Sequence, residues 1–173
     1  MSISEEEKVK LEEIYQSFLH NEKVKQMINI PLHRGSNCYE HCFKVAKKAI
    51  RHANRSFKKN INYRSLLIGA ILHDYYLYDW RNEKTRKKRH GRNHPFIASK
   101  NSERDFEITE DVKRIIETHM WPINRKEYPK SKEAKIVSIC DKMVSVGEVL
   151  TSIKFKAKRR KKYQAYIQKL FDK

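Results

Sequence analysis

Residues 73–80 read HDYYLYDW, and they directly follow the apolar run LLIGAIL at residues 66–72. His73 and Asp74 therefore end a stretch whose composition suits a buried helix. Ionisable side chains are costly to bury unless they are paired or bind a cation. The doublet raises the question whether other His and Asp residues are spaced so that they meet it.

The rest of the chain has helical rather than strand periodicity. Its 173 residues include only four Gly and four Pro, too few for the frequent tight turns of a β-sandwich or barrel. We predict an all-α fold of about six to eight helices. We divide it into an N-terminal helical segment at residues 1–30, a main domain at 31–152 and a basic C-terminal helix at 153–173.

Short polar residues predict where several helices begin. Four helix starts are expected at good capping residues: Ser4, with Glu7 as a capping box, and Asn62, Thr109 and Ser131. Gly35 and Ser36 suit the start of a helix over residues 37–55. Pro95 suits the first turn of a short helix over residues 95–101.

Five His and Asp residues share the apolar face of their predicted helices, because each lies three, four or seven positions from apolar neighbours. They are His41, His73, Asp74, His119 and Asp141. One inward histidine is usually an ordinary core residue, but this set comes from four separate helices. A shared metal centre would neutralise the aspartates and use neutral imidazoles as ligands. His94 lies at a predicted loop-to-helix junction and is not placed by this pattern.

The order His41, His73-Asp74, Asp141 resembles that of the HD-domain superfamily. Three segments resemble the family around these positions: YEHCFKVAKKA at 39–49, LLIGAILHDYY at 66–76 and IVSICDKM at 136–143. HPFIAS at 94–99 and IIETHMWP at 115–122 resemble the two extra histidine segments of members with two metals. The resemblance covers residues 33–150, and HDYYLYDW is similar to one bacterial subgroup of uncharacterised HD hydrolases.

This resemblance implies a helical phosphohydrolase that uses one or two divalent metal ions, drawn from Fe, Mn, Zn, Ni, Co and Mg. It implies a phosphorylated small molecule or a nucleotide as substrate. The implied metal ligands are His41, His73, Asp74 and Asp141 for the first ion, with Asp74 bridging to a second ion on His94 and His119. The catalytic candidates are His73 and Asp74 from this resemblance, together with Lys142 from its position beside Asp141.

Some residues depart from the family pattern. The single-metal nucleotidase type of the family has the pattern His-Asp-x-x-Glu. Leu77 occupies the position of that Glu, which favours the His-rich type instead. The small Gly-Ala pair of the family is Ala98-Ser99 here, and the Gly-Tyr-Pro signature of the cyclic-dinucleotide branch is absent. His90 competes with His94 as the ligand, but the spacing of His94 to the small pair favours His94. His90 is then expected to lie behind the ligands or to face the substrate.

Two other basic residues are candidates for substrate binding. Lys142 directly follows Asp141 and could contact a phosphate, although a surface lysine is an equally good interpretation. Arg34 precedes the first ligand helix and could flank the pocket, or simply lie on a surface loop. The aromatic residues after the doublet, Tyr75, Tyr76, Tyr78 and Trp80, suit either packing of a helix end or stacking on a base.

The formal net charge is +18, and the runs 81–92 and 154–162 each hold seven Lys or Arg residues. Such charge attracts anions, so a nucleic-acid-binding protein with a vestigial or structural metal site is our alternative hypothesis. A helical interaction module stabilised by one metal is a third. Three cysteines form no disulfide framework, and no signal peptide or membrane span is evident, so we expect a cytoplasmic protein. The oligomeric state is left open by the sequence.

Overall fold

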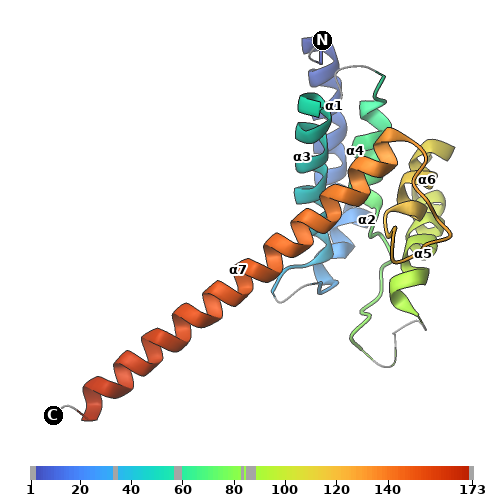
Figure 1. Ribbon diagram of the computed structural model, residues 1–173. Helices are drawn as coiled ribbons and strands as arrows, with labels where there is room; N and C mark the ends of the chain where they lie inside the picture. The colour runs from blue at the N-terminus through green and yellow to red at the C-terminus, as the bar shows by residue number, and fades with distance from the viewer. Residues whose placement is uncertain (1–2, 33–34, 57–59, 83, 85–88, 172–173) are drawn as a thin grey trace.

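The computed structural model describes residues 3–32, 35–56, 60–82, 84 and 89–171, with side chains described as far as residue 154. None of these residues belongs to a strand, which confirms the all-α prediction. The helices are α1 (Glu5–Leu19), α2 (Glu22–Lys25), the 3-10 helix η1 (Gln26–Asn29), α3 (Cys38–Ser56), α4 (Tyr63–Leu72), α5 (His90–Asp105), α6 (Glu110–Thr118) and α7 (Lys132–Phe171) (Figure 1). No helix in these ranges is long and apolar enough to cross a membrane.

Side-chain caps fix the starts of the helices for which the sequence predicted them. The capping oxygens accept from backbone N–H groups as follows: Ser4 from Glu7 at 3.2 Å, Asn62 from Ser65 at 3.0 Å, Thr109 from Val112 at 3.4 Å, and Ser131 from Ala134 at 3.1 Å. Helix α3 begins two residues after Ser36. There Asn37, which we had not singled out, accepts from the N–H of Glu40 at 2.8 Å.

The prediction for Pro95 was wrong. Helix α5 begins five residues earlier, at His90, and ends at Asp105, so Pro95 lies inside the helix. Proline at this position removes the one hydrogen bond that residue 95 would donate to the carbonyl of Gly91, and the helix continues without it. As a consequence, His90 and His94 lie one turn apart on the same helix.

Helix α7 is a single helix from Lys132 to Phe171. The basic segment at 153–173, expected as a separate helix, continues α7 through residue 171 and extends away from the other helices (Figure 1). The side chains that were expected to dock this segment, Tyr163, Tyr166, Ile167 and Leu170, lie outside the described side chains.

The core forms where α3 and α4 pack together and against α6 and α7. Gly69 on α4 lets α6 approach closely, because a Cβ atom at this position would lie 2.6 Å from Cγ2 of Ile115. Both helices end beside each other after this contact. The residue that follows α4 is His73, and the residue that follows α6 is His119.

Candidate metal centre

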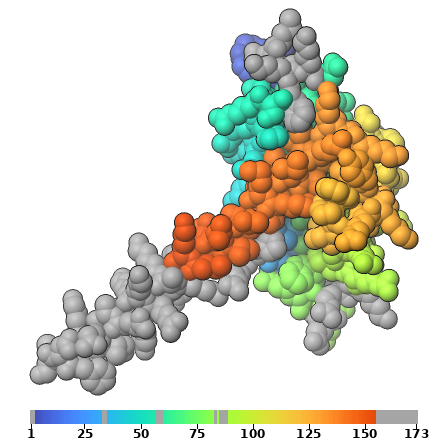
Figure 2. Space-filling view, in the orientation of Figure 1, coloured from blue at the N-terminus to red at the C-terminus, as the bar shows by residue number. Residues whose placement is uncertain are grey.

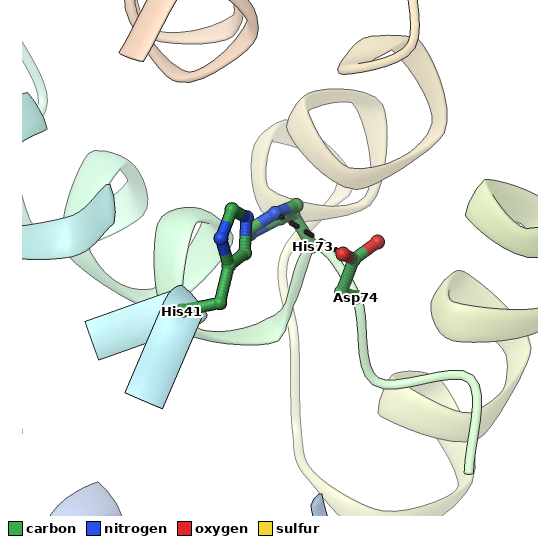
Figure 3. Close-up of side chains that lie close together, drawn as sticks. All are labelled: His41, His73 and Asp74. Atoms are coloured by element: carbon green, nitrogen blue, oxygen red, sulfur yellow. Dashed lines mark ion pairs between the residues drawn. The ribbon is translucent and has the colours of Figure 1, made fainter. Parts of the chain in front are cut away.

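Six His and Asp side chains from five helical segments meet in the core. His41 comes from α3, His73 and Asp74 follow α4, His94 lies on α5, His119 follows α6, and Asp141 lies on α7. Their side chains are buried, with exposed fractions of 0–7%. Figure 3 shows His41, His73 and Asp74 close together, with His73 beside the carboxylate. The structure therefore brings together every residue that the sequence suggested as a metal ligand.

Three of the histidines are oriented by backbone carbonyls. The Nδ1 atoms lie 2.8 Å from Ala70 O for His73, 2.9 Å from His90 O for His94 and 2.7 Å from Ile116 O for His119. A carbonyl only accepts hydrogen bonds, so in the neutral ring the proton is on Nδ1. Each Nε2 then carries a lone pair that points into the cluster, as a metal ligand requires.

Asp74 lies between two groups of these nitrogens. Its Oδ2 is 3.6 Å from Nε2 of His73, while its Oδ1 is 3.1 Å from Nε2 of His94 and 3.5 Å from Nε2 of His119. The two carboxylate oxygens thus face different sets of histidines. Asp74 therefore lies between two sets of candidate ligand nitrogens.

The contact between His94 and His119 is best explained by a cation. Their Nε2 atoms are 3.0 Å apart, although neither neutral ring has a proton there to donate. Two nitrogens bound at 2.0–2.1 Å to one metal ion lie roughly 3 Å from each other. Within the described part of the chain, Nε2 of His73 and Oδ1 of Asp74 are also buried without a hydrogen-bond partner. These residues therefore fit a divalent metal.

Asp141 completes the group on the other side of Asp74. Its Oδ1 is 3.0 Å from Nε2 of His41 and 3.8 Å from Nε2 of His73, and it accepts a hydrogen bond from Ser145 Oγ at 3.3 Å. Three sets of side chains have ligand atoms within 4.8 Å of one another: His41, His73 and Asp74; Asp74, His94 and His119; and His73, His119 and Asp141. Asp74 belongs to two of these sets.

Glu148 is a site residue that the sequence reasoning missed. Its Oε2 accepts from Nδ1 of His41 at 3.1 Å and from Ser36 Oγ at 3.3 Å, and its Oε1 lies 2.9 Å from Nζ of Lys44. It orients His41 as the backbone carbonyls orient the other three histidines. Glu148 lies seven residues after Asp141, two turns along α7, so both side chains lie on the same face of this helix.

The carboxylates of the cluster are held in their charged form. Burial raises the pKa of Asp74 and of Asp141, but the surrounding histidines outweigh burial and lower both pKa values below the ordinary range. Burial likewise raises the pKa of Glu148, yet hydrogen bonds from His41 and Lys44 bring it down to about 2. The site therefore presents negative charge to a cation.

His119 and His41 differ in the direction in which their surroundings shift the pKa. Burial, reinforced by the neighbouring histidines, lowers the pKa of His119 to about 3, so this ring is neutral and ready to bind a metal. Burial also lowers the pKa of His41, but the hydrogen bonds to Asp141 and Glu148 outweigh it, so that the pKa of His41 is raised. A cation at His41 must compete with a proton.

A pocket of about 350 Å³ opens onto the cluster. Besides five of the ligands, its walls are formed by Leu32, Trp80, His90, Gly91, Met120, Ile123, Lys142 and Ser145. A larger groove of about 630 Å³ between α1 and α3 contains none of the six ligands. The pocket at the cluster is therefore the one in which substrate could meet a metal.

Of the three predicted substrate-binding residues, the structure describes Lys142 and His90. Nζ of Lys142 lies at the pocket and donates to His119 O at 2.9 Å, Ser138 O at 2.9 Å and Ser138 Oγ at 3.0 Å. Arg34 lies outside the described residues, as do several residues of the basic run 81–92. His90 also lines the pocket.

His90 forms the middle of a stack of three rings. Trp80 stacks on one face at 5.4 Å and 13°, and His94 stacks on the other at 4.7 Å and 24°. Nδ1 of His90 is 2.7 Å from the hydroxyl of Tyr78, and burial lowers the pKa of His90 to about 4. His94, not His90, reaches Asp74, and His90 supports it from behind as a neutral ring.

A model of the HD domain family matches residues 38–145, well over half of the chain. The match runs from the first residue of α3 to beyond Asp141 and thus includes all six clustered residues. No curated protein and no solved structure matches the chain.

Proposed function

Because the chain belongs to the HD domain family, we propose that it is a metal-dependent phosphohydrolase that cleaves a phosphoester or phosphoanhydride bond. The observation that carries this proposal is the buried ligand set, above all the two facing Nε2 atoms of His94 and His119 beside Asp74. No apolar core needs such a group. Buried lone pairs that face each other at hydrogen-bond distance are stabilised only by a proton or a cation between them.

We assign the ligands to two divalent ions. His41, His73, Asp74 and Asp141 would hold the first, and Asp74, His94 and His119 the second. When bound, two such ions lower the pKa of a nucleophilic water and offset the negative charge of the phosphoryl oxygens. The six side chains contribute a buried set of ligand atoms, and five of them also line the pocket, where substrate could reach a bound ion.

The pocket favours a nucleotide or another small phosphorylated metabolite as substrate. Its volume of about 350 Å³ is at the small end of the range of ligand pockets. The ligands occupy its floor, while Leu32, Trp80, Met120 and Ile123 contribute apolar walls. A substrate would place its phosphate on the floor and an apolar or aromatic moiety, such as a base, against these walls. Lys142, His90 and Arg34 are proposed to help position it.

Hydrolysis by an Asp74 variant tests this function. We expect the wild-type protein, loaded with Mn²⁺, Fe²⁺ or Zn²⁺, to hydrolyse at least one nucleotide or phosphomonoester in a panel. Asp74→Ala should lose both metal binding and hydrolysis, because it removes the carboxylate shared by both ligand groups. Asp111→Asn, on an exposed position of α6, is the matched control and should retain both. Full activity of Asp74→Ala would refute the proposal.

The charge of +18 favours nucleic-acid binding as a second candidate function. Lysine and arginine contacts to phosphates would make the affinity fall steeply as salt increases. Titration with single- and double-stranded RNA and DNA at low and at physiological salt tests it. A protein that fails to bind any of them at low salt would exclude this function and leave the hydrolase proposal unaffected.

A further inference from the structure

The outer face of α7 carries a row of apolar side chains that no described part of the chain covers. Among the described residues, ten large apolar side chains are exposed, and five of them lie on this helix. These five, which we call the α7 seam, are Ile139, Met143, Val146, Leu150 and Ile153, with exposed fractions of 49–58%. Figure 2 shows this part of α7 crossing the surface of the helical body.

The α7 seam has the spacing of a coiled coil. Its members follow one another at intervals of four, three, four and three residues, which is the alternation of a and d positions in a heptad repeat. This spacing lines up side chains along about 21 Å of one helix face, at 1.5 Å per residue. Such a row is complementary to another helix, whose side chains fit between its members.

The opposite face of α7 is already used. Val137 and Asp141 point into the body and are buried. The helix is thus apolar on two sides, and described residues cover one of them. A helix that is apolar on both sides belongs between two packing partners.

We propose that the α7 seam of a second copy of this chain covers it, so that the protein is a dimer through an antiparallel pair of α7 helices. The positions that flank the seam, where charges normally select a partner, are Cys140, Lys142, Gly147, Val149 and Lys154. Three are uncharged, the ammonium group of Lys142 is held by His119 and Ser138, and Lys154 lies at the outer end of the seam. The seam is therefore complementary to itself, as the interface of a symmetric dimer must be.

The charge of the following segment sets the orientation. Residues 154–162 contain seven Lys and Arg residues, and α7 continues through them as one helix. A parallel pair would bring two such segments together along their whole length, and like charges repel. An antiparallel pair places them at opposite ends, with the two-fold axis near Val146 at the middle of the seam.

Mass measurement with two matched variants tests the dimer. In size-exclusion chromatography with light scattering over a range of concentrations, the wild-type protein should have twice the chain mass of 20.8 kDa. Val146→Glu should have the mass of one chain and keep its metal content and helical circular dichroism, because residue 146 faces away from the ligands. Val9→Glu introduces the same charge at another valine that is also 58% exposed, on α1, and should remain a dimer.

Two results would overturn the proposal. A wild-type protein of single-chain mass at every concentration would assign the seam to a different partner, such as an acidic helix of another protein. A dimer that Val146→Glu does not weaken would lie on another surface. For the orientation, Ile153→Cys should form no intermolecular disulfide on oxidation, because the two residues 153 of an antiparallel pair are too far apart. Ready cross-linking of this variant would show a parallel pair.

Discussion

Four histidine rings in the cluster are fixed by the partners of their Nδ1 atoms, and these partners are of two kinds. His73, His94 and His119 use backbone carbonyls, which mutation of a neighbouring side chain cannot remove. His41 uses the carboxylate of Glu148. The orientation and basicity of His41 therefore depend on one replaceable side chain.

Replacement of Glu148 by Gln should weaken metal binding at the His41 group. The amide keeps the shape but loses the charge that makes His41 a stronger ligand, and such changes typically cost 10–100-fold in metal affinity. Competition with a chromophoric chelator measures the effect. Glu40→Gln is the matched control, because Glu40 also pairs with Lys44, at 4.0 Å, but is not paired with His41. Equal affinities of the two variants would show that Glu148 does not act on the metal.

Metal affinity should fall as the pH decreases from about 8 to about 6, because protons compete for the ligand nitrogens. Asp141 and Glu148 raise the pKa of His41 above its ordinary value of 6.5, so competition at this ring begins above pH 6.5. His119, whose pKa is about 3, stays neutral over this range. Titration calorimetry in buffers of different ionisation enthalpy should detect released protons. Binding that neither depends on pH nor releases protons would contradict this assignment.

Helical phase and residue type predicted five of the six clustered residues, and the family resemblance added His94. His41, Asp141 and the others lie at fixed intervals from apolar residues, and the family motif gave their order. Glu148 has the same phase as Asp141 but stands in a stretch with exposed residues on both sides. Its role depends on a contact with α3, 107 positions away, and no local pattern contains that information.

At the scale of helices, capping residues predicted the starts of four elements and failed at α5. The residue before α5 is Arg89, which adopts a left-handed conformation with φ of 54° and makes no side-chain cap. Arginine is not a residue that usually marks a helix start, so this start was invisible in the sequence. Because α5 begins at His90, His94 lies in the second turn of this helix.

The site depends on the close contact between helices α4 and α6 at Gly69. Gly69→Ala should destabilise the protein by about 1–3 kcal/mol, because the new methyl group would overlap Ile115 and push α4 and α6 apart. His73 and His119, with ring centroids 4.8 Å apart, would separate, and metal affinity should fall as well. Urea denaturation and chelator competition measure the two effects.

Gly147→Ala is the control for this substitution. It also places alanine in a helix, but the new methyl group meets no atom within 4 Å. It should therefore stabilise the chain by about 0.5–1 kcal/mol through helix propensity alone. If both variants lost the same stability, the close approach of α4 and α6 at Gly69 would not be the cause.

At the scale of the whole molecule, α7 connects the buried ligand cluster with the exposed α7 seam. Its inner face supplies Asp141 and Glu148 to the site, and its outer face carries the α7 seam. We did not predict this continuity, because the charge run after residue 153 suggested a separate basic helix. Helical propensity continues through Lys and Arg residues, so the change in charge does not mark the end of the helix.

The metal content of the purified protein tests the central claim most directly. Elemental mass spectrometry on protein prepared without chelators or a histidine tag would count the ions per chain. The two ligand groups that share Asp74 predict about two divalent ions per chain. One ion per chain would contradict the role of His94 and His119 as ligands of a second ion. No ion, even after addition of Mn²⁺, Fe²⁺ or Zn²⁺, would contradict the metal centre as a whole.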